Sequence, residues 1–163
     1  MSKAFTRESD DAPESSVLIR PASVLPPGTK NYMTAGGIQR LREEFQRITD
    51  VLARTPAASG TRSVLEGRCQ QLQHTLETAV VVPASSRDQR VRFGATVSVR
   101  SRGGEASEYR IVGVDETEVD RDWVSWLSPI AKALTGRAVG ERVRIRLPAG
   151  ETELEITGIR YEE

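Results

Sequence analysis

The sequence predicts an α+β protein in which an antiparallel helical hairpin precedes a small antiparallel β domain with one short helix. Three observations predict this fold class: two mirror-image heptad patterns of apolar residues, a run of helix breakers between them, and a later change to two-residue alternation. The 163 residues suffice for one ordinary domain or two small ones. We expect a flexible tail at 1–30, the hairpin at 31–82, a linker at 83–90 and the β domain at 91–163.

The tail is predicted from its composition. Residues 1–30 combine charged residues, serines and prolines with one short apolar run, Val17 to Ile19. Such a segment cannot bury enough apolar surface to offset the entropy lost on ordering. The Leu-Pro-Pro-Gly stretch at 25–28 predicts the boundary with the hairpin.

Two heptad seams predict the hairpin. Apolar residues recur from Ile38 at spacings of three, four, three and four, and from Leu65 at spacings of four, three, four and three. One antiparallel register, with its turn between Ala58 and Ser59, pairs all five layers. At a rise of about 1.5 Å per residue, each seam is roughly 21 Å long. The ten seam residues are Ile38, Leu41, Phe45, Ile48, Leu52, Leu65, Cys69, Leu72, Leu76 and Ala79.

Capping residues and helix breakers define the ends of the two helices. Thr34 is predicted to cap the first helix, although Gly36-Gly37 weakens its first turn. Thr55-Pro56 ends that helix, and the stretch RTPAASGTRS (54–63) forms a tip without an acidic, histidine or aromatic residue. Ser63 begins a capping-box pattern, so the second helix is expected to start there or a few residues earlier.

Alternating residues predict a twisted antiparallel sheet in the last region. A short helix is predicted within it, because Ser128 can cap, Pro129 suits the first helical position and Gly136 suits the C-terminal stop. The sheet is expected to cover this helix, as in a compact α+β domain. The predicted strands are VRFGATVSVR (91–100), EYRIVGV (108–114), WVSWL (123–127), RVRIRL (142–147) and ELEITGIRY (153–161).

Composition excludes several classes of function. Lysine and arginine together number 23, as do aspartate and glutamate, which argues against strong direct nucleic-acid binding. No apolar run is long enough for a membrane span or a signal peptide, so the expected location is the cytoplasm. The lone histidine, His74, is expected on the surface, and Cys69 as a packed thiol in the seam. No catalytic residue, metal site or cofactor is predicted.

Charged clusters in the β domain have more than one interpretation. An acidic loop could hold a divalent cation, but a solvated loop or a docking surface is the more frequent role of such a cluster. The arginines of RVRIRL could bind phosphate, but glutamates of ELEI on the neighbouring strand favour cross-strand charge pairing. The acidic loop comprises Asp115, Glu116, Glu118, Asp120 and Asp122.

Five segments carry a resemblance to a known family: NYMTAGGIQRLREEF (31–45), VRFGATVSV (91–99), YRIVGVDE (109–116), SPIAKALTGRAVGERV (128–143) and LPAGETELEITGIRYE (147–162). In this order they resemble segments of the bacterial Gre family of transcript cleavage and elongation factors. The resemblance implies an FKBP-like C-terminal domain that docks at the rim of the secondary channel of bacterial RNA polymerase. The hairpin would then point toward the active centre. The polymerase-contacting residues that the resemblance implies are Asp115, Glu116, Ser128, Pro129, Ile130, Ala131 and Leu134.

The hairpin tip departs from the family pattern. Cleavage in this family depends on a tip motif of the type Asp-x-x-Glu-Asn-Ala, whose carboxylates help to hold a second magnesium ion. No Asp-x-x-Glu-Asn stretch occurs between residues 34 and 82. Relative to cleavage factors, about ten residues are missing from each arm, which shortens the rod by roughly 15 Å. We therefore expect a protein that binds polymerase and modulates transcription elongation without stimulating RNA cleavage.

Four alternatives remain open at this stage. One is a cleavage-competent elongation factor that uses Asp50 or Glu66, the acids nearest the turn. Another is a polymerase-binding protein similar to nucleoside diphosphate kinase regulators, which have a reduced hairpin. A prolyl isomerase would need an aromatic-lined pocket, which 5% aromatic residues supply poorly. The last is a coiled-coil interaction module with another partner. A monomer is the simplest expected state.

Overall fold

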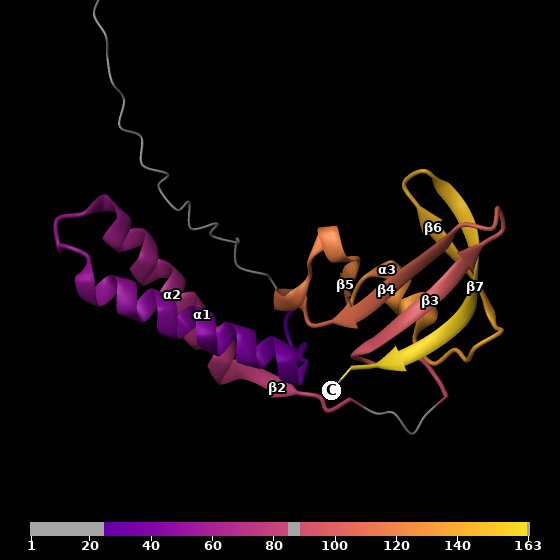
Figure 1. The fold of residues 1–163 in the computed structure, drawn as a ribbon, viewed down its shortest axis with the longest axis horizontal. Helices are drawn as coiled ribbons and strands as arrows, with labels where there is room; N and C mark the ends of the chain where they lie inside the picture. The colour runs from indigo at the N-terminus through magenta and orange to yellow at the C-terminus, as the bar shows by residue number, and fades with distance from the viewer. Residues whose placement is uncertain (1–24, 85–88, 163) are drawn as a thin grey trace, which may run out of the picture.

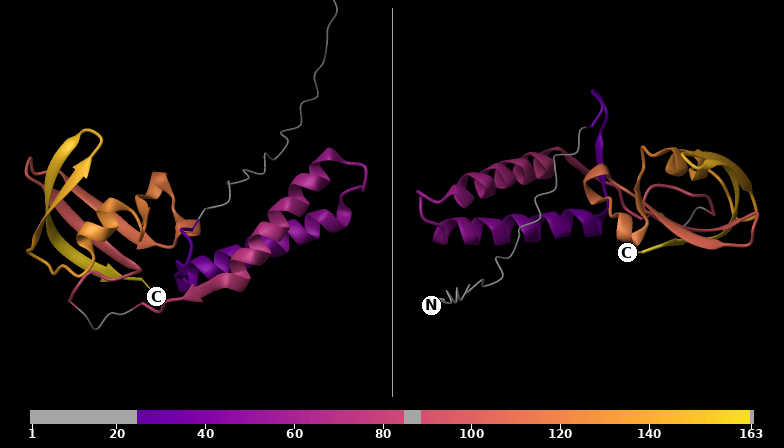
Figure 2. Two further views of the ribbon diagram at one scale, coloured as in Figure 1. Left: turned by 180° about the vertical axis from the view of Figure 1, so that it is seen from behind. Right: turned by 90° about the horizontal axis from the view of Figure 1, so that it is seen from above.

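A helical hairpin projects from a curled β-sheet (Figure 1). The structure, a computed structural model, describes residues 25–84 and 89–162. The predicted tail up to residue 24 and half of the predicted linker, residues 85–88, lie outside the described residues. Figure 2 shows the two helices side by side and directed away from the sheet, so that their connection is the part of the hairpin farthest from it.

The hairpin consists of α1 (Ala35–Arg54) and α2 (Gly60–Thr78). Thr34 caps α1 as expected, because its side chain accepts a hydrogen bond from the Gly37 amide. All ten seam residues lie in one apolar cluster, together with Met33. Burial is deepest at Leu65 and Leu72, which are 2% and 1% exposed.

The tip is closed by an arginine, not by a side-chain cap on α2. Helix α2 begins at Gly60, three residues before the capping-box serine, and Ser59 at its N-cap makes no side-chain hydrogen bond. Instead, Arg62 Nη1 donates to the carbonyl oxygens of Leu52 at 3.3 Å and Thr55 at 2.8 Å. These carbonyls belong to the C-terminal end of α1, where a cation is favoured by the helix dipole.

Two short strands close the base of the hairpin. Strand β1 (Asn31–Met33) pairs in parallel with β2 (Ala79–Val81), with Asn31 opposite Ala79. Ala79, expected as the last seam residue of a helix, therefore lies at the start of a strand while it still packs in the seam cluster. Three-residue strands carry too little alternation to be predicted from sequence.

The second sheet has five strands in the order β5-β4-β3-β7-β6. The expectation of a wholly antiparallel sheet is wrong at one edge, where β5 pairs in parallel with β4. Two short 3₁₀ turns, η1 (Val114–Glu116) and η2 (Val119–Arg121), carry the chain back before β5 begins. The strands are β3 (Ala95–Ser101), β4 (Ala106–Val112), β5 (Trp123–Ser125), β6 (Arg142–Leu147) and β7 (Gly150–Tyr161).

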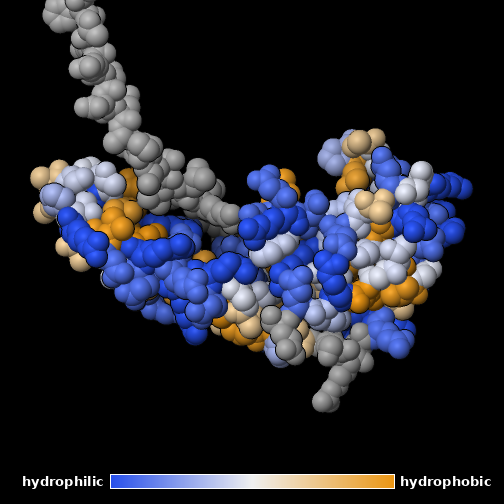
Figure 3. All heavy atoms as spheres, viewed as in Figure 1, coloured by the Kyte–Doolittle hydropathy of each residue, from blue (hydrophilic) through white to orange (hydrophobic). Residues whose placement is uncertain are grey.

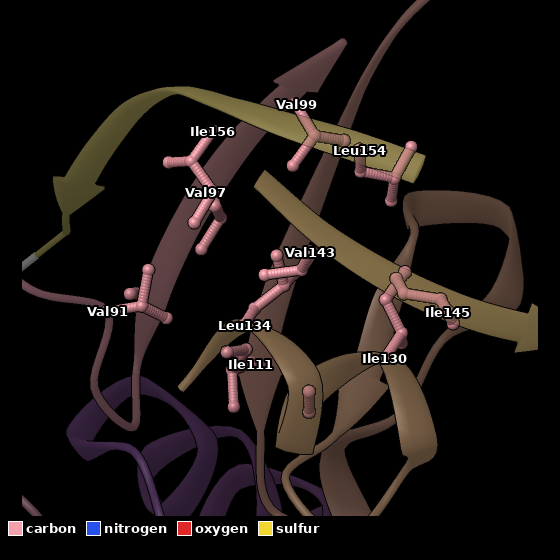
Figure 4. Close-up of a cluster of buried hydrophobic side chains, with 12 residues drawn as sticks. Val91, Val97, Val99, Ile111, Ile130, Leu134, Val143, Ile145, Leu154 and Ile156 are labelled. Atoms are coloured by element: carbon pink, nitrogen blue, oxygen red, sulfur yellow. The ribbon is translucent and has the colours of Figure 1, made fainter. Parts of the chain in front are cut away.

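The curled sheet encloses the short helix α3 (Pro129–Leu134), as Figure 4 shows. Ser128 caps this helix by accepting from the Ala131 amide, and Gly136 has the positive φ of a C-terminal stop. Along β6, valine and isoleucine point into the core, whereas the arginines point outward. Arg142 and Arg144 lie within ion-pairing distance of glutamates on β7, so the predicted cross-strand charge pairing is present.

Replacing Leu72 with alanine tests the contribution of the seam. The side chain is 1% exposed, so we expect the exchange to lower the free energy of unfolding by about 2–5 kcal/mol. The matched control is Val64→Ala on the same helix, where the side chain is 46% exposed and a change within about 0.5 kcal/mol is expected. Urea unfolding followed by far-UV circular dichroism measures both. Equal losses would contradict the packing described here.

Candidate functional site

A buried carboxylate joins the hairpin to the five-stranded sheet. Glu116, in the turn η1 that follows β4, is only 5% exposed. Its Oε2 accepts hydrogen bonds from the backbone amides of Thr34 and Gly113, both at 2.9 Å, and its Oε1 accepts from the Thr34 hydroxyl. Arg40 Nη2 on α1 lies 3.5 Å from the same Oε1. These contacts satisfy a charge that would otherwise be costly to bury.

One hydroxyl group has two structural roles at this junction. Thr34 Oγ1 accepts from the Gly37 amide, which caps α1, and donates to Glu116. Two glycines leave room for this arrangement: a Cβ atom at Gly37 would lie 1.8 Å from Glu116 Oε1, and one at Gly113 would lie 2.2 Å from the carbonyl oxygen of Tyr32. The first turn of α1 and the attachment of the sheet therefore depend on the same few atoms. We call Thr34, Gly37, Gly113 and Glu116 the joint.

Rings and arginines pack around the joint. The Arg40 guanidinium lies 4.8 Å from the ring centroid of Trp123, and the guanidinium of Arg110 lies 4.7 Å from it. On the other side, the ring of Tyr32 in β1 lies 5.1 Å from that of Trp126, with the two rings edge to face. The hairpin and the sheet thus contact each other both through an arginine stacked on a ring and through a pair of rings.

The joint was only partly visible in the sequence. Thr34 was predicted as a cap, but Glu116 was assigned to a partner-contacting loop. The available signal was Gly36-Gly37, because glycine costs up to about 1 kcal/mol in a helix and commonly indicates a close approach of other atoms. The sequence alone could not show which group approaches Gly37, since Glu116 is 82 positions away from Thr34.

The two segments that the resemblance assigned to a partner lie at one edge of the sheet. Val112 at the end of β4 is in register with Ser125 at the end of β5. Because the two strands are parallel, the residues that follow them emerge at the same edge. Asp115 and Ser128 each lie three positions beyond these strand ends. The parallel pairing that the sequence did not predict is therefore what brings them to one edge.

Burial reduces the number of predicted contact residues whose side chains a partner could reach. Ile130, Ala131 and Leu134 belong to the core of the β domain, and Glu116 is held in the joint. Their side chains are not available to a partner in this conformation, because each is already packed or hydrogen-bonded inside the fold. The residues of the predicted set that retain accessible surface are Asp115, Ser128 and Pro129.

The hairpin tip carries no acidic cluster. Asp50 accepts a hydrogen bond from Gln46 at 3.1 Å, and Glu66 is ion-paired with Arg62 at 2.8 Å. Within residues 25–84 and 89–162, no three acidic, histidine or cysteine side chains are grouped so that they could hold a metal ion. This includes the acidic loop, where burial of Glu116 separates one carboxylate from the others. His74 is exposed, and Cys69 Sγ lies 3.7 Å from Thr49 Oγ1.

A pocket of about 530 Å³ lies beside the joint. The composition predicts that an aromatic-lined pocket is poorly supplied, yet three of the chain's eight aromatic rings meet here. None of the helices in the described part of the chain is both long and apolar enough to cross a membrane. The lining residues are Tyr32, Val82, Phe93, Ile111, Trp126, Lys132 and Thr135.

Comparison with known proteins relates the chain to transcription factors. Residues 86–161 match the family model described as "Transcription elongation factor, GreA/GreB, C-term". The chain is 38% identical to transcription elongation factor GreA of Alkalilimnicola ehrlichii, over 82% of this chain and 99% of that protein. It is 31% identical to GreB of Neisseria meningitidis, over 82% and 95%. Among solved structures, the GreA factor homolog 1 (Gfh1) of Thermus thermophilus is 23% identical, covers 81% of this chain and 99% of its own, and has a TM-score of 0.42.

Alanine substitutions at two neighbouring glycines test the joint. Both exchanges gain the same helix propensity, up to about 1 kcal/mol, so their difference reports the space available. Gly36→Ala meets only the mobile end of Arg40 at 3.4 Å and is expected to be neutral or stabilising. Gly37→Ala meets Glu116 and is expected to lower the free energy of unfolding by about 1–3 kcal/mol.

Hydrogen exchange locates the effect. The amides of Thr34 and Gly113 donate to Glu116, so Gly37→Ala should accelerate their exchange while Gly36→Ala should not. Indistinguishable exchange rates in the two variants would show that Glu116 does not hold the joint.

Proposed function

Because the chain belongs to the GreA/GreB family of transcription elongation factors, we propose that it binds bacterial RNA polymerase at the rim of the secondary channel and modulates elongation without stimulating RNA cleavage. The observation that supports the proposal is the bare tip: a hairpin attached to its domain through the joint ends in a stretch, residues 54–63, without an acidic or histidine side chain. Such a protein acts by occupying space in the channel. Competition with other channel-binding factors follows from the same geometry.

Electrostatics at the tip support the absence of cleavage. A second magnesium ion needs carboxylates whose oxygen atoms point toward it. The charged groups nearest the helix ends are instead the exposed Arg54 and the capping Arg62, whose positive charges would repel a cation. The two nearest acids, Asp50 and Glu66, already have partners along their own helices.

The length of the hairpin also argues against stimulation of RNA cleavage. Helices of 20 and 19 residues give a rod of about 30 Å at the usual rise. The match with the Alkalilimnicola protein extends over 156 positions but includes only 82% of the 163 residues of this chain, so the relative has residues without a counterpart here. A catalytic ligand displaced by about 1 Å already functions poorly. We infer that the residues without a counterpart lengthen the hairpin of the relative, and a tip that falls several ångströms short of that length cannot place a ligand.

The edge of the sheet beside the joint supplies the proposed docking surface. Asp115, Ser128 and Pro129 are its accessible members, presented at the ends of β4 and β5. Docking through this edge would fix the direction of the hairpin, because η1 also carries the joint carboxylate. The joint thus connects the docked surface rigidly to the rod.

An RNA cleavage assay tests the missing activity. Stalled polymerase complexes carrying radiolabelled RNA should show no shortening of the transcript when the protein is added, and a GreA or GreB protein from one of the relatives serves as the active control. The double variant Asp50→Ala/Glu66→Ala should behave as the unmodified chain does. Shortening that the double variant abolishes would show a cleavage-competent factor and overturn the proposal.

Charge reversal tests the docking surface. Asp115→Arg places a cation on the proposed contact and is expected to weaken binding to core polymerase by about ten-fold or more. The matched control, Asp120→Arg, changes an exposed acid in the neighbouring turn η2 and should leave binding within about two-fold. A titration of labelled protein with core polymerase measures both. Equal weakening would place the contact elsewhere, and an unmodified chain that fails to bind would exclude the proposed partner.

A further inference from the structure

The pocket beside the joint has walls from both parts of the molecule. Tyr32 and Val82 belong to the base of the hairpin, and Phe93, Ile111 and Trp126 belong to the β domain. Residues of α3 and its C-terminal cap complete the lining. A volume of about 530 Å³ is in the range of pockets that hold small organic molecules, typically about 300–1,000 Å³.

The walls are apolar and partly uncovered. The rings of Tyr32, Phe93 and Trp126 are each half-buried, with ring centroids 6.1 Å apart for the first two. Val80 and Val81, which precede Val82 in the chain, are 41% and 45% exposed. Figure 3 shows hydrophobic surface gathered over β2 at the base of the hairpin. An apolar body in the pocket would remove the exposed part of the three rings from water.

The lining residues of the pocket carry two nitrogen donors, on Lys132 and Trp126. Lys132 is exposed, and no carboxylate in the described part of the chain lies within ion-pairing distance of it. Trp126 Nε1 is buried, yet no acceptor in the described residues receives its hydrogen. The Thr135 hydroxyl already donates to the Ala131 carbonyl oxygen. A lysine cation without a carboxylate partner beside an apolar pocket favours an occupant with negative charge.

We propose that this pocket binds a small organic anion with an aromatic or branched aliphatic body. The body packs against the three rings, and a carboxylate or sulfonate group pairs with Lys132. The inference does not rest on the proposed function, because it concerns the free protein. A bound molecule contacts the hairpin base and the β domain together, so it stabilises the arrangement in which both walls are present.

Two fluorescent probes of similar shape test the pocket with the full-length chain. The anionic probe is 1-anilinonaphthalene-8-sulfonate, and the neutral probe is N-phenyl-1-naphthylamine. Both should bind, with a blue-shifted emission. The chain has two tryptophans, so a ¹H–¹⁵N spectrum contains two indole N–H signals, which Trp123→Phe assigns. Either probe should move the Trp126 signal and leave that of Trp123, which packs under Arg40 and Arg110.

Two variants with matched controls separate charge from shape. Lys132→Glu should weaken the anionic probe about ten-fold and leave the neutral probe within about two-fold, whereas Lys30→Glu, at another exposed lysine, should change neither. Phe93→Ala should weaken both probes about five-fold. Val119→Ala, at a valine that is 91% exposed outside the pocket, should weaken neither.

Either of two outcomes would show that the pocket is not a binding site. One is the absence of binding by both probes. The other is binding that leaves the Trp126 signal in place and survives Lys132→Glu and Phe93→Ala, since that result describes adsorption to other apolar surface. Binding in the pocket by the neutral probe alone would also refute the assignment of an anionic ligand, even if the apolar site itself were real.

Discussion

The direction of the hairpin depends on one buried carboxylate. Glu116 is stable inside the fold because two backbone amides and a hydroxyl donate to it and Arg40 lies nearby. That hydroxyl belongs to Thr34, which also caps α1. The first turn of the helix and its attachment to the sheet are therefore coupled. Without the Glu116 carboxylate, the Thr34 hydroxyl at the start of α1 has no acceptor for its proton. Without Thr34, the carboxylate loses the hydroxyl that donates to it. A helix that merely followed a flexible linker would have no such coupling.

A rigid base matters because the hairpin is a lever. At about 1.5 Å per residue, α1 is about 30 Å long, so a tilt of about 10° at its base would move the tip by about 5 Å. Under the proposed function, in which the hairpin occupies a channel of the polymerase, this displacement would decide what the tip obstructs. The apolar pocket lies beside the joint, and its lining residues Tyr32 and Trp126 are in edge-to-face contact with each other. A molecule bound in the pocket would therefore influence the orientation of the hairpin.

The sequence predicted the parts of the fold that local periodicity determines. The heptad seams predicted the hairpin and the members of its apolar cluster, because Leu65, Leu72 and the other seam residues repeat at helical spacing. The cap at Thr34 and the ends of α3 followed from local chemistry. The parallel strand β5 was missed, because three residues carry too little pattern and the turns η1 and η2 redirect the chain. For the site, the bare tip could be read directly, whereas the buried role of Glu116 depends on contacts between distant residues. A charged residue in an acidic stretch gives no local indication that it is buried.

The distribution of costly features favours a positioning role for this hairpin. Gly37 lies inside a helix, where alanine would gain up to about 1 kcal/mol of helix propensity, and its lack of a Cβ atom is needed only because Glu116 occupies the space. Burying that carboxylate costs further free energy, which the surrounding donors offset. The tip has no feature with a comparable cost in folding free energy. Small residues form its turn, and Arg62 donates hydrogen bonds to the carbonyls at the end of α1. A rod that served only to hold two helices together would need neither the glycine nor the acid at its base. The residues with a stability cost thus lie where the orientation of the hairpin is determined, as the proposed positioning role requires.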